Sequence, residues 1–87
     1  MNLARHKIFE KHYKVRILPN KNLTRRFEEN LDLFLEKPGE PILKDHKLIG
    51  KMNGYRSFSV GGDFRVVYRI IGNTLELYDI GTHNQVY

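Results

Sequence analysis

The chain has 87 residues and a mass of 10.3 kDa, which gives room for one domain with one small core. This size excludes a barrel enzyme and a nucleotide-binding domain joined to a substrate domain, and the absence of cysteine excludes disulfides and thiolate metal sites. The formal net charge of +5 at pH 7 indicates either a polyanionic or acidic protein partner or a solvated basic surface.

The first 27 residues form a basic segment with eight Lys and Arg against the single acid Glu10, a net charge of +7. Apolar residues recur there at i, i+4 and i+8, which predicts a helix with one apolar stripe of Phe9, Tyr13 and Ile17. The segment is too charged for a signal peptide, and no apolar run is long enough to cross a membrane. We therefore expect a cytoplasmic protein without a membrane partner.

A second helix is predicted after the break at Leu18-Pro19-Asn20. Its apolar stripe consists of Leu23, Phe27, Leu31, Phe34 and Leu35. Asn20 or Thr24 is the expected N-cap, and Glu36-Lys37-Pro38-Gly39 ends the helix. The short break favours an antiparallel helical hairpin, whose end lies in an acidic stretch with one Lys against five acids at residues 28–40.

From about residue 48 onward the apolar period changes to two, which is typical of strands. The predicted strands are residues 55–60, 64–71 and 74–80. Gly61-Gly62-Asp63 and the two-residue turn Gly72-Asn73 join them into an antiparallel meander, and residues 2–5 are a candidate edge strand. The sequence therefore predicts an α+β fold with one domain at residues 1–87, in which an N-terminal helical hairpin packs on an antiparallel β-sheet.

The two faces of the predicted sheet differ in chemistry. The helices are expected to cover the face that carries Phe64, Val66, Tyr68 and Ile70. The opposite face would present Arg65 and Arg69 to solvent, where a guanidinium can donate two parallel hydrogen bonds to a phosphate. The alternative is that both arginines pair with Glu76 or Asp79 across the hairpin.

Four histidines are candidates for proton transfer, because the pKa of histidine lies near neutrality. His6 and His12 lie in the first helix, where we expect them on the surface. His46 precedes the sheet and His83 follows it, both in loop-like contexts, where site residues concentrate. Their spacing, without cysteine, does not favour zinc, so no metal is expected; the alternative is that both are ordinary surface histidines.

A set of short motifs then stands in order along the chain: His46-Lys47-Leu48, Gly50-Lys51, Gly54-Tyr55-Arg56-Ser57, Asp63-Phe64-Arg65-Val66-Val67-Tyr68, and Ile80-Gly81-Thr82-His83 followed by Tyr87. Together they resemble the RelE/ParE superfamily of type II toxin–antitoxin toxins, nearest to the RelE/StbE and YafQ-like mRNA interferases. The resemblance covers nearly the whole chain and is strongest over residues 43–87.

The resemblance implies a microbial-RNase type of fold, with a helical hairpin on a twisted antiparallel sheet. It also implies an endoribonuclease that cleaves mRNA in the ribosomal A site without a metal or another cofactor. In that reaction a ribose 2′-hydroxyl attacks the adjacent phosphate and leaves a 2′,3′-cyclic phosphate and a 5′-hydroxyl. The implied protein partner is a cognate antitoxin, and an acidic segment would suit the basic face.

The resemblance also assigns roles to single residues. Arg65 is expected to stabilise the transition state, His83 to act as general acid and His46 as general base, although the two histidines could exchange roles. Asp63 is expected to orient catalytic groups, and Tyr87 to stack on a base or contact phosphate. The expected RNA backbone contacts are Lys47, Lys51, Arg56 and Arg69.

Two positions depart from the YafQ-like pattern: Ser59 stands where that group often has a histidine, and Asp79 where it has an arginine. Two alternatives therefore stay open, namely a ParE-like toxin that inhibits DNA gyrase without catalysis and a catalytically decayed toxin that only binds its antitoxin. The combination of His46, Arg65 and His83 favours the nuclease, because a gyrase inhibitor needs no proton-transfer groups.

Overall fold

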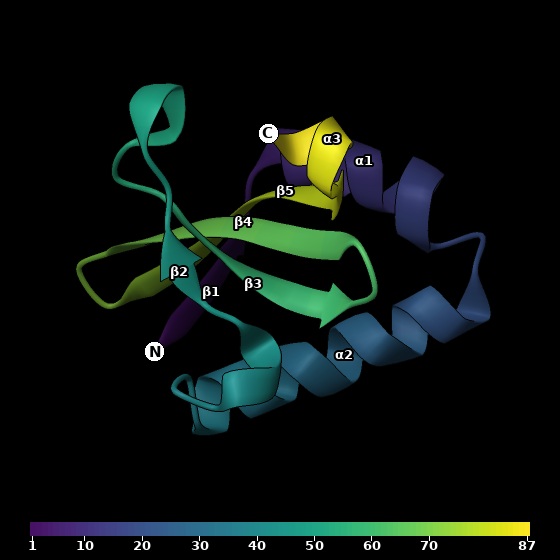
Figure 1. Cartoon of the computed structure of the whole chain (residues 1–87), viewed down its shortest axis with the longest axis horizontal. Coiled ribbons are helices and arrows are strands. Elements are labelled where there is room, and N and C mark those ends of the chain that lie inside the picture. Colours follow the sequence, from purple (N-terminus) through teal and green to yellow (C-terminus); the bar gives the residue numbers. More distant parts are fainter.

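The computed structural model describes residues 1–87 and contains one five-stranded sheet in the order β1-β5-β4-β3-β2 (Figure 1). The strands are β1 (Asn2–Arg5), β2 (His46–Lys47), β3 (Arg56–Gly61), β4 (Phe64–Ile71) and β5 (Thr74–Thr82). The predicted meander of β3, β4 and β5 is confirmed, and so is the edge strand β1, which pairs parallel to β5. The short strand β2 pairs with β3 and was not predicted. The sheet is therefore antiparallel except at β1.

The helices begin where side chains cap them. They are α1 (Lys7–His12), which continues as a π-helical turn (Tyr13–Ile17), α2 (Lys21–Glu36) and the short α3 (His83–Val86). The Asn20 side chain accepts hydrogen bonds from the amides of Asn22 and Leu23 at 3.0 and 3.2 Å, so Asn20 rather than Thr24 caps α2. Helix α2 ends at Glu36, because the residue that precedes a proline disfavours helical dihedral angles.

The main core lies between the helical hairpin and one face of the sheet. The ring of Phe27 in α2 lies 5.8 Å from Phe9 and 5.3 Å from Tyr13, so the two arms of the hairpin touch. Both arms pack on Val66 and Tyr68, as the alternation in β4 predicts. The prediction for Ile70 is wrong: the β4–β5 hairpin extends past the helices (Figure 1), and Ile70 is 49% exposed.

The opposite face of the sheet is not left to solvent, which corrects the sequence-based expectation. Val67 is fully buried and forms a second apolar cluster with Leu48 and Val86. The segment that contains β2 folds back over this face, and α3 covers it after β5 (Figure 1). This second layer positions the candidate site. No helix of the chain has the length and hydropathy that a membrane span requires.

Candidate active site

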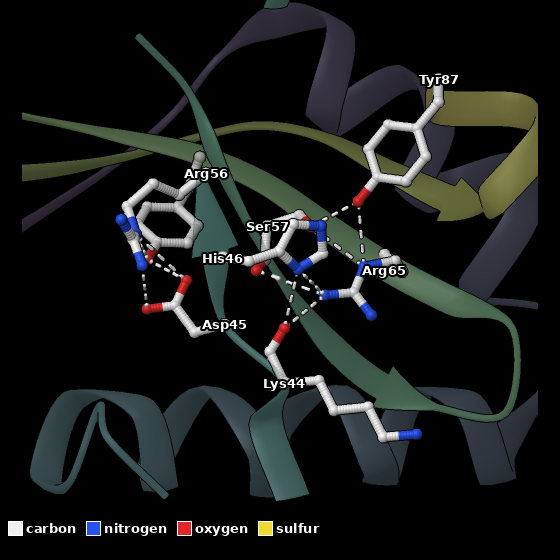
Figure 2. Close-up of polar contacts among 8 residues, drawn as sticks. Lys44, Asp45, His46, Arg56, Ser57, Arg65 and Tyr87 are labelled. Carbon is white, nitrogen blue, oxygen red and sulfur yellow. Dashed lines mark hydrogen bonds and ion pairs between the residues drawn. The ribbon is translucent and has the colours of Figure 1, made fainter. Parts of the chain in front are cut away.

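Arg65 is the centre of a polar network on the face of the sheet opposite the helical hairpin (Figure 2). Its Nε donates to the hydroxyls of Ser57 and Tyr87, both at 3.0 Å. Its Nη2 donates to the carbonyl oxygens of Lys44 at 2.9 Å and Ser57 at 3.3 Å. Every acceptor is neutral, and Nη1 makes no hydrogen bond. The network thus fixes the guanidinium without neutralising its charge.

The other two arginines of the predicted site are engaged with carboxylates. Arg56 pairs with Asp45 at 3.3 Å, and Arg69 pairs with Glu76 at 2.7 Å. Hydrogen bonds to these carboxylates raise the pKa of both guanidinium groups. The cross-hairpin pairing that the sequence allowed is therefore present for Arg69 and absent for Arg65. Arg56 and Arg69 lie outside the Arg65 network, and a phosphate would have to compete with their acidic partners.

His46 lies in β2, beside the Arg65 guanidinium. Its Nδ1 is 3.0 Å from the carbonyl oxygen of Lys44, and Nη2 of Arg65 is 3.4 Å from the same nitrogen. Nη2 of Arg65 lies closer to the Lys44 carbonyl oxygen, at 2.9 Å, than to Nδ1. We therefore assign a proton to Nδ1, so that the imidazole and the guanidinium both donate to this carbonyl. The lone pair of a neutral His46 is then on Nε2. Such an imidazole can take up a proton at Nε2.

The carbonyl that holds both groups belongs to a residue with unusual dihedral angles. Lys44 has φ 48° and ψ 39° and is the only non-glycine residue with a positive φ. A left-handed conformation costs an L-residue about 1–2 kcal/mol. The sequence gives no signal for it, because glycine and asparagine are the residues that usually adopt this conformation.

Asp45 fixes the chain just before His46, and sequence reasoning missed its role. The hydroxyl of Tyr68 donates to its carboxylate at 2.6 Å, and Nε of Arg56 donates to it at 3.3 Å. Burial of Tyr68, with a smaller contribution from the hydrogen bond to Asp45, raises the pKa of the Tyr68 hydroxyl. This clamp ties the β2 segment to the sheet. The sequence pattern predicts Tyr68 as a core residue, and no motif places it near Asp45, because the two residues are far apart in the sequence.

His83 begins α3 and Tyr87 directly follows this helix, where the sequence predicted a loop. The side chain of Gln85 accepts a hydrogen bond from the amide of Thr82 at 2.8 Å, which stabilises the first turn of α3. The turn brings Tyr87 back to the sheet, where its hydroxyl contacts both Ser57 and Arg65. The ring of Tyr87 lies 4.6 Å from that of His83, edge to face. A helical turn therefore links the two residues.

Asp63 lies in the turn between β3 and β4, close to the start of α3. Its carbonyl oxygen accepts a hydrogen bond from the amide of His83 at 3.1 Å. Its carboxylate makes no hydrogen bond or ion pair. The contact between Asp63 and the candidate site thus runs through the backbone, whereas the sequence-based role requires the carboxylate.

A pocket of about 580 Å³ lies next to this network. It is lined by His46, Lys47, Leu48, Ile49, Lys51, Met52, His83 and Tyr87. Two histidines therefore share one cavity with two lysines that form no ion pairs, and Arg65 adjoins it through the Tyr87 hydroxyl. The arrangement combines groups that can transfer protons with unpaired cations that can stabilise negative charge, and a reaction at a phosphate requires both.

The two departures from the family pattern lie away from this pocket. The carboxylate of Asp79 faces the α1 side and contacts His12 at 2.6 Å and Arg16 at 3.6 Å. Its negative charge is therefore compensated, and it does not line the pocket. His12 is consequently half-buried rather than on the surface, and the ring of His6 packs against Tyr78 at 4.8 Å. Ser59 is buried, and its hydroxyl accepts from the Gly61 amide at 3.0 Å.

The sequence matches one protein family along its length. Residues 1–87 match the family model for the bacterial toxin of the type II toxin-antitoxin system, YafQ. A comparison with curated protein sequences finds no match.

Solved structures of bacterial toxins share the fold. A crystal structure of YafQ from E. coli strain BL21(DE3) superposes with a TM-score of 0.85 at 22% identity, over 99% of this chain and 97% of that one. The E. coli DinJ–YafQ complex matches with a TM-score of 0.81 at 22% identity, over the same shares of the two chains. A metal-bound toxin from Helicobacter pylori matches with a TM-score of 0.79 at 28% identity, over 100% of this chain and 99% of that one.

Proposed function

The chain belongs to the YafQ family of bacterial type II toxins, within the RelE superfamily, and from this premise we propose that it is an endoribonuclease that cleaves mRNA on the ribosome. One observation carries the proposal: His46 and His83 line one pocket beside Arg65, a fixed guanidinium without a carboxylate partner. A toxin that only blocks another protein needs no such combination.

The reaction begins with attack of a ribose 2′-oxygen on the adjacent phosphorus. Nε2 of His46 takes the 2′-hydroxyl proton, because Nδ1 already donates to the Lys44 carbonyl. The new bond joins the 2′-oxygen to phosphorus, and the bond between phosphorus and the 5′-oxygen of the next nucleotide breaks. A protonated His83 gives its proton to that 5′-oxygen. The products are a 2′,3′-cyclic phosphate and a 5′-hydroxyl.

Arg65 stabilises the negative charge that develops on the phosphate oxygens. Its free Nη1 is the donor available to them, while Nε and Nη2 hold the plane of the guanidinium on the sheet. Tyr87 completes the wall of the pocket and offers its ring to a base. The positive charge comes from Arg65 and the proton transfers from the histidines, so the proposed reaction uses no metal or other cofactor.

The ribosome supplies the positioning that so small an open pocket lacks. Holding two reacting groups in the attack geometry accounts for about 7–11 kcal/mol of an enzymatic barrier. An mRNA codon ordered in the ribosomal A site would arrive in a defined conformation. We therefore propose mRNA on the translating ribosome, in the cytoplasm, as the substrate.

A cognate antitoxin is the proposed protein partner. The DinJ–YafQ complex pairs a toxin of similar fold with a second protein. The basic pocket here, with Lys47 and Lys51 free of ion pairs, would be blocked by an acidic segment that folds onto it.

The test is cleavage of 5′-labelled mRNA in a defined translation reaction, with and without ribosomes. We expect cleavage with ribosomes only, and loss of cleavage in the variants Arg65→Ala and His83→Ala while both variants keep the native fold. Cleavage of free RNA would remove the ribosome from the proposal. Intact mRNA in both reactions, or full activity in both variants, would refute the proposed site, and a DNA gyrase supercoiling assay would then test the non-catalytic alternative.

A further inference from the structure

A second pocket of about 420 Å³ lies on the other side of Lys44 from the candidate active site. It is lined by Arg26, Glu29, Asn30, Ile42, Lys44, Ser59, Val60, Gly61 and Gly62. Lys44 connects the two sites: its carbonyl oxygen accepts from Arg65 at 2.9 Å, while its side chain extends away from that network toward α2 (Figure 2). A chain molecule that leaves the active site on this side would meet the second pocket next.

The second pocket contains two cations that no carboxylate neutralises. Arg26 and Lys44 form no ion pair, whereas Glu29, the one acid in the lining, is bonded to Arg25 at 3.2 Å. Arg25 is exposed and is not part of the lining. The net charge that faces an occupant is therefore positive, and an anion could bind without displacing an existing carboxylate.

Arg26 packs against Gly61 at the end of β3. An ideal Cβ at Gly61 would lie 3.0 Å from Cδ and 3.1 Å from Nη1 of Arg26, so the arginine lies directly against the glycine backbone. Gly61 has φ +115°, a conformation that other residues rarely adopt. The Arg26 side chain can lie this close to the backbone only because residue 61 has no side chain.

Ser59 adds a donor at the same place. Its hydroxyl accepts from the Gly61 amide at 3.0 Å, and its own proton remains available to a phosphate oxygen. Ser59 is also a position at which the sequence departs from the YafQ-like pattern. Ser59, which occupies the position of that histidine, therefore lines the second pocket.

We propose that this second pocket is a phosphate subsite that binds the RNA backbone to one side of the scissile phosphate, through Arg26, Lys44 and Ser59. The proposal rests on the proposed function, because it takes the RNA bound at Arg65 as its starting point. The subsite would fix the direction and register of the RNA, so the protein would read a longer stretch of backbone than the cleaved dinucleotide.

The test measures binding rather than cleavage, with RNA oligonucleotides that carry a 2′-deoxyribose at the scissile nucleotide. Fluorescence anisotropy compares Arg26→Gln and Lys44→Gln with the matched control Lys21→Gln, which removes one positive charge from the same helix outside the pocket and leaves the pair of Arg25 with Glu29 intact. One lost phosphate contact on a single strand lowers the dependence of log K on log salt by about 0.7, which is about fivefold in affinity at 0.1 M salt. We expect this loss for Arg26→Gln and Lys44→Gln and a salt slope for Lys21→Gln equal to that of the wild type.

Oligonucleotides lengthened one nucleotide at a time separate a subsite from general attraction. The Arg26→Gln effect should be absent for the shortest RNA and should set in at one length, on extension toward one end only. Equal losses for Lys21→Gln and Arg26→Gln at every length would overturn the subsite. It would also be overturned if Arg26→Gln bound RNA normally but bound an Asp- and Glu-rich ten-residue peptide more weakly, which would assign the pocket to an acidic protein segment.

The same measurements distinguish this proposal from the proposed function. Wild-type protein that shows the length-dependent Arg26 effect but leaves ribosomal mRNA intact would refute the nuclease and keep the subsite. Protein that cleaves mRNA on ribosomes, while its Arg26 and Lys44 variants bind RNA like the wild type, would keep the nuclease and refute the subsite.

Discussion

At the scale of single residues, the pairing state of each arginine separates the candidate catalytic group from the structural ones. Arg65 donates only to neutral oxygens, whereas Arg56 and Arg69 each face a carboxylate. A guanidinium fixed by neutral acceptors keeps its charge for a ligand, and one paired with a carboxylate does not. The distinction depends on the partner and not on the residue type.

The geometry of Arg65 predicts that its charge alone is insufficient. Arg65→Lys keeps a cation but loses the planar group that can donate to Ser57, Tyr87 and a phosphate at the same time. We expect single-turnover mRNA cleavage on ribosomes to fall about 100-fold or more. The control is Arg25→Lys at an exposed ion pair on α2, which should cleave at the wild-type rate. Cleavage by Arg65→Lys within a few-fold of wild type would contradict the assignment.

At the scale of elements, two short segments carry the histidines of the pocket, and contacts with the sheet hold each of them. The Asp45 clamp holds β2, which carries His46, and the Gln85 side chain stabilises the first turn of α3, which begins at His83 and leads into Tyr87. Both elements are too short to be stable alone, since an isolated helical turn or a two-residue strand gains few hydrogen bonds. Their attachment therefore sets the geometry of the pocket.

The clamp predicts a pH dependence of stability. The raised pKa of Tyr68 means that the folded protein holds the phenolic proton more tightly than the unfolded chain, which loses it near pH 10.0. The contribution of Tyr68 to the free energy of unfolding is thus fully present below pH 10.0. Above this pH the contribution decreases by up to about 1.4 kcal/mol per pH unit. Urea unfolding between pH 8 and 11 should show this decrease in wild type and a smaller one in Tyr68→Phe. Parallel curves for the two proteins would show that Tyr68 does not contribute.

The attachment of α3 predicts a loss of activity at small cost in stability. Gln85→Ala removes the acceptor for the Thr82 amide, and we expect about 1 kcal/mol or less of lost stability but about tenfold slower cleavage, because His83 and Tyr87 lose their fixed position. Gln85→Glu is the matched control, since a glutamate at this position can accept the same hydrogen bond. Thermal unfolding and ribosomal cleavage are measured in parallel. Equal cleavage by both variants would show that the cap does not position the site.

At the scale of the whole molecule, a chain with a net charge of +5 carries free cations at both pockets. The acids at Asp45, Glu76 and Asp79 are each paired with a cation, whereas the lysines of the first pocket and the two cations of the second form no ion pair. Both pockets therefore present positive charge to a polyanion. Such a field raises the rate at which a polyanion associates.

This charge distribution predicts the salt dependence of RNA binding. Three phosphate contacts by Arg65, Lys47 and Lys51 would lower the affinity for single-stranded RNA about 20-fold between 50 and 200 mM salt. Two further contacts by Arg26 and Lys44 would raise this loss above about 100-fold. Anisotropy titrations give the slope, with an uncharged-backbone analogue of the same sequence as the control. An affinity that does not change with salt would show that these cations do not contact phosphates.

Local periodicity accounts for the parts of the fold that the sequence predicted. The stripes of Phe9 and Phe27, the turn at Gly72-Asn73 and the cap at Asn20 each depend on residues a few positions apart. The ordered motifs over residues 43–87 identified the family, because they lie in the strands of the sheet and in the segments next to them. Such features are determined by the sequence alone.

The tertiary structure decided which of the candidate groups meet. The pairing of Arg69 with Glu76, the burial of Val67 and the contact between Asp45 and Tyr68 join residues from different elements. The carbonyl of Lys44 accepts hydrogen bonds from both His46 and Arg65. Every residue has such a backbone carbonyl, so the sequence gives no signal for this role. Periodicity describes neighbours along the chain, whereas a site depends on which distant segments pack together, and that is decided only when the chain folds.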